Sequence, residues 1–283
     1  KAELTATERV GFHRYTFPES KESRIIFDVG HRQGESSGVT EAIIRLSGKK
    51  ELVGSIETYP EYLKFCDPEK RVKMYFVIRL NKEAESFGAF SEAEVFKSQK
   101  DSKGTGNGMY LNFSTRKDEV VEMQVGLSYT SIENAKNNLL AEATGKTFDK
   151  VKNTAHQKWN EKLGRIQVEG KDSINKVKFY TGLYHALLGR GLASDTNGQY
   201  IQHNGKIGQI ALNSKGKPKY NHYNTDGIWG GFWNLGQLWA FESRFCQGNR
   251  LASRWCGGRC TLQWCSDQLF RIDDCGNLQL WNS

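Results

Sequence analysis

The hydrophobic period of the chain changes near residue 130, and no other feature of the sequence constrains the fold as strongly. Before this point, β-branched and aromatic runs such as "RIIFDV", "VTEAIIRL", "KMYFVIRL" and "VVEMQVGLSY" are separated by turn residues. Short strands at this spacing, several of them alternating apolar and polar positions, are typical of antiparallel sheets. The pattern therefore predicts a β-sandwich over residues 1–130.

After residue 130 the apolar positions recur at the helical spacing instead. Ser131 can cap a helix through "IENAKNNLLAEA", and Thr147 can cap the next one. The second of these helices carries an apolar stripe spaced 3, 4, 4 and 4, formed by Phe148, Val151, Ala155, Trp159 and Leu163. A third helix presents one face made of Ile174, Val177, either Tyr180 or Thr181, Tyr184 and Leu188. Residues 131–190 are thus predicted to be a helical linker.

Residues 191–222 return to strand character. Asn204-Gly205 lies between two short runs and predicts a tight hairpin turn. Within residues 223–240, Asp226 or Thr225 can cap a fourth helix, whose core-facing stripe is formed by Ile228, Phe232, Leu235 and Trp239. Trp229 lies on the neighbouring face in the first turn, where both buried packing and ligand contact are open to it.

Charge and hydropathy exclude two classes of protein. The net charge is +8, but Lys and Arg are scattered among acidic residues, and the aromatic stretch "DGIWGGFWNLGQLW" has neither. A nucleic-acid-binding surface needs a basic stripe beside its aromatics, so no nucleic-acid partner is expected. No stretch of eighteen apolar residues occurs, so no membrane span is expected.

Few residues in the best-patterned part of the chain carry catalytic chemistry. Asp195, in "SDTNG", is predicted to be a turn residue. His185 lies on the apolar face of the third helix and is predicted to pack in a core, and His203 and His222 have no partner at a metal-binding spacing. We therefore assign no catalytic residue and no metal ligand.

The end of the chain differs in composition from the rest. Five of the six cysteines fall within residues 241–283, while Cys66 stands alone before them. Their spacing fits neither paired zinc knuckles nor a closed disulfide framework. Trp-Cys dipeptides recur here, and a shift of one nucleotide turns such a codon pair into ordinary small residues. We interpret residues 241–283 as a frame-shifted, disordered tail.

The order of five segments resembles glycoside hydrolase family 92, the calcium-dependent exo-acting α-mannosidases. These segments are "ELTATERVGFHRYTFP", "VGLSYTSIENAKNNLLAE", "FDKVKNTAHQKWNEKLGRIQVEG", "KFYTGLYHALLGRGLASDTNGQY" and "YNTDGIWGGFWNLGQLW", which together span residues 3–240. The resemblance implies an N-terminal β-sandwich, a helical linker and a C-terminal (α/α)6 barrel. Residues 1–130 would then be part of the sandwich, and residues 223–240 the first helix of the barrel.

The resemblance also implies an activity. It is the hydrolysis of mannose-containing glycans by an exo-α-1,2-mannosidase that inverts the anomeric centre with two carboxylates and calcium. The family's general acid, general base and most calcium ligands lie in barrel segments that this chain does not match, so the chain as printed is expected to be inactive alone. A secreted, periplasmic or cell-surface location is implied in the same way.

Two residues are candidates for substrate contact through the resemblance. Trp229 matches the Trp of a Trp-Asp pair at the start of the first barrel helix, but Gly230 stands where the Asp would be. Asp226 is the nearest acidic residue and is equally open to a role as a helix cap. The alternative function is a stand-alone carbohydrate-binding β-sandwich module without catalysis.

Overall fold

A computed structural model describes residues 1–32, 37–60, 69–92, 94–170, 172–188, 191–202 and 204–223, and three short strands at 261–263, 269–272 and 278–281. The chain divides into two compact units. The first unit comprises Lys1–Leu183, Leu192–Ile201 and Ile207–His222, and the second comprises Tyr184–Gly191, Gln202–Lys206 and Tyr223–Ser283.

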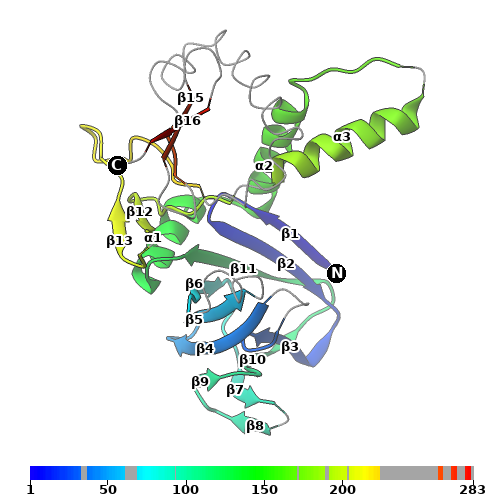
Figure 1. The fold of residues 1–283 in the computed structure, drawn as a ribbon. Helices are drawn as coiled ribbons and strands as arrows, with labels where there is room; N and C mark the ends of the chain where they lie inside the picture. Colours follow the sequence, from blue (N-terminus) through cyan, green and yellow to red (C-terminus); the bar gives the residue numbers. More distant parts are fainter. Residues whose placement is uncertain are drawn as a thin grey trace. The chain divides into compact units, whose positions relative to one another are not determined.

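Two antiparallel sheets form most of the first unit (Figure 1). The larger sheet has seven strands in the order β1 (Ala2–Ala6), β2 (Val10–Phe17), β11 (Glu119–Ser128), β6 (Val72–Leu80), β5 (Glu51–Pro60), β4 (Ser37–Ser47) and β9 (Asp101–Gly104). The smaller sheet has four, in the order β3 (Ser20–Asp28), β10 (Asn107–Thr115), β7 (Ser86–Ser91) and β8 (Glu94–Lys97).

The inner faces of both sheets supply one hydrophobic core. Along β10 every second residue is buried, as the alternating sequence requires, and Met109, Leu111 and Phe113 are essentially inaccessible. These side chains pack with residues of the larger sheet such as Ile44 and Leu52. The predicted antiparallel β-sandwich is therefore confirmed.

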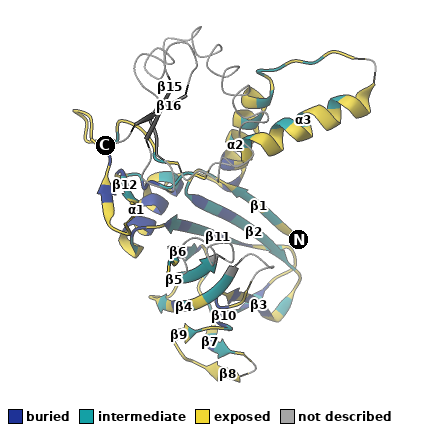
Figure 2. Ribbon diagram, in the orientation of Figure 1, coloured by how far each residue is buried: buried dark blue, intermediate teal, exposed yellow. Residues whose placement is uncertain are grey.

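Helix α1 (Ile132–Ala143) covers the opposite face of the larger sheet, and Figure 2 shows its buried residues in dark blue. The helix begins where the sequence predicts, because the Ser131 hydroxyl accepts a hydrogen bond from the Asn134 N–H at 3.0 Å. Gly126 on β11 allows the close approach, since a Cβ there would lie 2.4 Å from the Ala135 carbonyl oxygen. A second core forms here, from Val10, Phe12, Val53, Val77, Ala135, Leu139, Ala143, Phe148 and Val151.

The next two helices are progressively less buried. In α2 (Phe148–Leu163), which Thr147 caps, Phe148 and Val151 are buried, but the remainder of the predicted stripe is only partly covered. In α3 (Ser173–Leu188) no residue is buried, and Val177 is 65% exposed. His185 is exposed as well, so the prediction that it packs in a core is wrong. The helical linker is present, but the apolar stripe of α3 is left uncovered by the described residues.

The hairpin predicted at Asn204-Gly205 is confirmed. It joins β12 (Gln199–Ile201) to β13 (Ile207–Gln209), which pair antiparallel, and Gly205 has a φ of +78°, a conformation that favours glycine. No helix in the described part of the chain is long and apolar enough to cross a membrane.

The predicted first barrel helix lies outside the described residues from position 224 onward. Within residues 241–283, three short strands pair antiparallel: β14 (Thr261–Gln263), β15 (Leu269–Ile272) and β16 (Leu278–Trp281). The other residues of this tail lie outside the description. The interpretation of the tail as frame-shifted and disordered stays a prediction.

Candidate functional site

A cluster of buried polar side chains lies where β11, α1 and the segment 192–201 meet. Ser128 ends β11, Thr130 follows it, and Asn134 and Asn138 lie one turn apart on α1. All four are buried, as is Asp195. We call these five residues the Asp195 cluster.

The carboxylate of Asp195 is the acceptor at the centre of the cluster. Its Oδ2 accepts hydrogen bonds from the Ser128 Oγ at 2.9 Å and the Thr130 Oγ1 at 2.5 Å, and its Oδ1 accepts from the Asn138 Nδ2 at 2.7 Å. Its backbone N–H donates to the Gln199 carbonyl, and its carbonyl accepts from the Gly198 N–H. Asp195 is thus a turn residue, as predicted, but its side chain has a second role that the sequence analysis missed.

No Lys or Arg of the described residues forms an ion pair with Asp195, although the residue is only 4% exposed. Burying a carboxylate is unfavourable unless hydrogen bonds replace its water. Three side-chain donors do so here, and hydrogen bonds to an ionised acceptor are stronger than those between neutral groups. Asn134 lies in the first turn of α1, which is the end of a helix that favours negative charge.

A partly buried ion pair adjoins the cluster. The Arg9 guanidinium lies 2.8 Å from the Glu142 carboxylate, which also accepts hydrogen bonds from the Arg9 backbone N–H and the Thr7 hydroxyl. Burial alone would raise the pKa of Glu142, but the hydrogen bonds from Thr7 and Arg9 outweigh it and hold this pKa below its usual value. The Arg9 Nε also donates to the Ser194 carbonyl at 2.6 Å, which links the pair to the segment beside Asp195.

The same segment holds the main chain at His222. The Ala193 N–H donates to the His222 carbonyl at 2.8 Å, and the His222 N–H donates to the Ser194 Oγ at 3.0 Å. The imidazole stacks on Tyr200, with ring centroids 4.4 Å apart. Burial lowers the pKa of His222, so its neutral form is favoured.

The predicted substrate-contacting residues, Trp229 and Asp226, lie outside the described residues. The structure brings the chain to Tyr223, the first residue of the segment that contains them, and does not test either one. Within the described residues, no group of three or more His, Cys, Asp or Glu side chains is placed to hold a metal ion.

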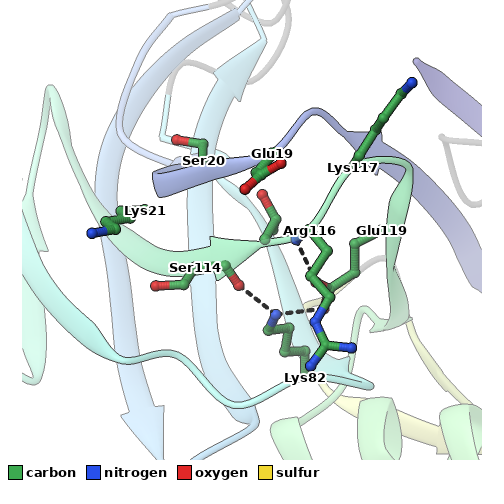
Figure 3. A pocket seen from close by; sticks show the side chains of 9 residues that line it. Glu19, Ser20, Lys21, Lys82, Ser114, Arg116, Lys117 and Glu119 are labelled. Carbon is green, nitrogen blue, oxygen red and sulfur yellow. Dashed lines mark hydrogen bonds and ion pairs between the residues drawn. The ribbon is translucent and has the colours of Figure 1, made fainter.

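A separate hollow of about 720 Å³ opens on the sandwich, and Figure 3 shows it from close by. The Lys82 Nζ donates to the Ser114 carbonyl at 2.6 Å and to the Glu119 carboxylate at 2.5 Å, so its charge is already paired. Lys21 and Lys117 point in opposite directions, and no aromatic ring is among the residues that line the hollow. It therefore offers neither a convergent charge nor a stacking surface for a sugar.

A signal for the Asp195 cluster is present in the sequence. Asn138 lies on the face of α1 that also carries the buried Ala135 and Leu139, so a polar side chain occupies a position that must be buried. A buried amide needs partners. What the sequence does not provide is the partner, because Asp195 is 57 residues away from Asn138.

Comparisons with known proteins agree with this architecture. Residues 1–128 match the model for the glycosyl hydrolase family 92 N-terminal domain, and residues 134–248 match that for the family 92 catalytic domain. No curated protein matches the chain.

Several solved structures are similar. A family GH92 α-mannosidase from Bacteroides thetaiotaomicron is 22% identical with a TM-score of 0.67, over 78% of this chain and 29% of that one. Its complex with mannoimidazole is 21% identical with a TM-score of 0.69, over 82% of this chain and 29% of that one. An inverting family GH92 mannosidase from B. thetaiotaomicron VPI-5482 is 21% identical with a TM-score of 0.68, over 83% of this chain and 30% of that one. The chain thus spans about three tenths of the length of these proteins, with the same fold.

Proposed function

Since the chain belongs to glycosyl hydrolase family 92, we propose that it is part of a glycosidase that acts on α-mannosides. The observation that carries the proposal is the match of residues 134–248 to the family's catalytic domain, directly after a match of residues 1–128 to its N-terminal domain. The similar structures, which include an α-mannosidase and its complex with mannoimidazole, support the choice of mannosides.

The finer proposal is an exo-acting α-1,2-mannosidase that inverts the anomeric centre. Inversion requires one carboxylic acid to protonate the leaving oxygen and a carboxylate to activate a water on the other face of the sugar, with the two groups roughly 6.5–9.5 Å apart. Asp195 is unsuited to either role, because it is buried and both of its oxygens are hydrogen-bonded. Because the family's catalytic carboxylates lie in barrel segments that this chain does not match, the proposal includes that the chain does not turn over substrate alone.

Calcium belongs to the proposal through family membership. This cation takes six to eight oxygen ligands and can bind sugar hydroxyls. The described residues do not fit such a site, so we derive no step through calcium.

Substrate contact is proposed for Trp229, whose ring suits the apolar face of a sugar, and for Asp226, whose carboxylate can accept from sugar hydroxyls. The partners would be mannose-containing glycans, and the proposed location is outside the cell: secreted, periplasmic or at the cell surface.

The first test is to sequence the coding DNA on both sides of the printed chain and to express the complete reading frame. Hydrolysis of α-1,2-mannobiose, with loss of activity in a chelator, is the expected result. The printed chain, assayed in parallel, is expected to show no turnover. Binding of mannosides by a well-folded protein, with no hydrolysis by either one, would contradict the proposal and favour the carbohydrate-binding module.

A further inference from the structure

The Asp195 cluster has no role in the chemistry proposed above, yet it joins three elements of the first unit. We propose that Asp195 is a positioning residue. Its buried carboxylate fastens the segment 192–201 to the end of β11 and to α1, and so fixes the point from which the chain enters the segment 223–240. The effect on ligand binding rests on the proposed function, whereas the fastening itself does not.

The hydroxyl donors of the cluster have little freedom to turn elsewhere. The Ser128 Oγ accepts a hydrogen bond from the Thr130 N–H at 2.9 Å, and the Thr130 Oγ1 accepts from the Asn134 Nδ2 at 2.6 Å. With these acceptor positions in use, the two O–H groups are directed to the Asp195 carboxylate. The carboxylate is therefore held by donors that the surrounding backbone and α1 have already oriented.

Asn138 extends the fastening to the residue after Asp195. Its Nδ2 donates to the Leu127 carbonyl at 2.8 Å as well as to Asp195, and its Oδ1 accepts from both the N–H and the hydroxyl of Thr196 at 2.9 Å. One amide side chain thus joins the end of the sandwich strand, the helix and the turn. Such a fully satisfied buried network rigidifies the backbone that it connects.

The residues before Asp195 carry the fastening on to His222. Ser194 accepts from Arg9 through its carbonyl and from the His222 N–H through its hydroxyl, while the Ala193 N–H donates to the His222 carbonyl. The stacking of His222 on Tyr200 adds a side-chain contact. The main chain is therefore fixed, within the first unit, up to the residue before Tyr223.

A matched pair of variants separates positioning from simple stabilisation. Thr130 and Thr115 are both buried threonines, 7% and 5% exposed, whose hydroxyls form hydrogen bonds. The Thr115 hydroxyl bonds to Ser23 and to the Pro18 carbonyl, away from the segment 192–222. Thr130→Val and Thr115→Val thus make the same chemical change, but only Thr130→Val weakens the hold on Asp195.

The reporters are the hydrogen-bonded backbone amides of Ala193, Asp195, Thr196 and His222, followed by hydrogen exchange in the full chain. In Thr130→Val we expect these amides to exchange at least about tenfold faster, because a lost hydrogen bond to a charged group opens the segment locally. In Thr115→Val, the exchange rates of these four amides, each divided by the rate of the sandwich amides, should equal the wild-type values. Thr130→Ser, which keeps the hydroxyl, should restore the slow exchange.

Equal acceleration of these amides in both valine variants, or in neither, would overturn the positioning role. Asp195→Asn is a second variant with a larger expected effect, because it removes the charge that all three donors share. If it does not fold, the Thr130→Val and Thr115→Val pair decides the question.

Titration of the full chain with methyl α-mannoside tests the link to function. We expect Thr130→Val to weaken the affinity by about three- to tenfold, and Thr115→Val to leave it unchanged. Unchanged affinity in Thr130→Val despite faster exchange would refute the link between fastening and ligand binding. If the wild-type chain binds no mannoside, the proposed substrate contacts fail, while the exchange data still decide the fastening.

Discussion

Helices α1 and α3 were both predicted from apolar residues at helical spacing, yet they differ completely in burial. α1 buries Ala135 and Leu139 against the sandwich, whereas α3 buries none of its residues and leaves Ile174 64% exposed. The difference shows that periodicity determines whether a helix forms and which face is apolar. Burial depends on whether another surface faces that stripe.

The largest effect should come from the buried face of α1. Leu139→Ala removes a side chain with 0% exposure from the second core, and we expect a loss of roughly 2–5 kcal/mol in the free energy of unfolding. Urea denaturation followed by circular dichroism measures it. A loss below about 1 kcal/mol would mean that α1 does not contribute to the core as the structure indicates.

Next in size is the ion pair that links α1 to the first strands. Glu142→Gln keeps the shape of the side chain but removes the charge that faces Arg9, and about 2 kcal/mol of stability should be lost at pH 7. The measurement is thermal or urea unfolding at neutral pH. Lys158, whose Nζ lies 3.2 Å from the exposed Glu8, offers a surface control, because Lys158→Gln should change stability little.

The same carboxylate makes a pH-dependent contribution of known sign. The folded-state pKa of Glu142 is lower than its unfolded value, so its stabilising effect is complete above the unfolded pKa. It is lost as the pH falls through the lower, folded-state pKa. Between about pH 7 and pH 3, the free energy of unfolding should therefore fall less steeply with decreasing pH in Glu142→Gln than in the wild type. The same pH dependence in both proteins would contradict this assignment.

Removing the N-terminal caps of α1 and α3 compares the two helices again, with a smaller expected loss of stability. Ser131→Ala deletes the hydroxyl that accepts from the Asn134 N–H, and about 1 kcal/mol of global stability should be lost. Asp172→Ala deletes the corresponding cap of α3, where the carboxylate accepts from the Ile174 N–H at 2.8 Å. Because the described residues bury no residue of α3, this second change should lower helicity without shifting the main unfolding transition. Equal shifts would show that the two helices are equally coupled to the sandwich.

The smallest effect belongs to the exposed stripe of α3. Val177→Ala should change the free energy of unfolding by less than about 0.5 kcal/mol, since the side chain is 65% exposed. Urea denaturation of the same kind as for Leu139→Ala makes the two values directly comparable. A loss near that of Leu139→Ala would mean that α3 is packed in solution against a surface outside the described residues.

Local patterns in the sequence were sufficient for several strands, for the helix caps and for one hairpin. Alternation along "VVEMQVGLSY", the caps at Ser131 and Thr147, and the turn at Asn204-Gly205 depend on residues a few positions apart, and the structure confirms each of them. The order of these elements also carried the resemblance to family 92. Such signals can be read from the chain because strand pleat, capping and turn geometry are local properties.

The tertiary structure alone decided which of these elements are packed and which polar groups meet. The sequence predicts only a turn residue at Asp195, because its donors, Ser128, Thr130 and Asn138, are 57 to 67 positions away in the chain. His185 was expected in a core that the described residues do not form around it. Burial and hydrogen-bond partnership depend on long-range contacts, which the spacing of residues within one element does not specify.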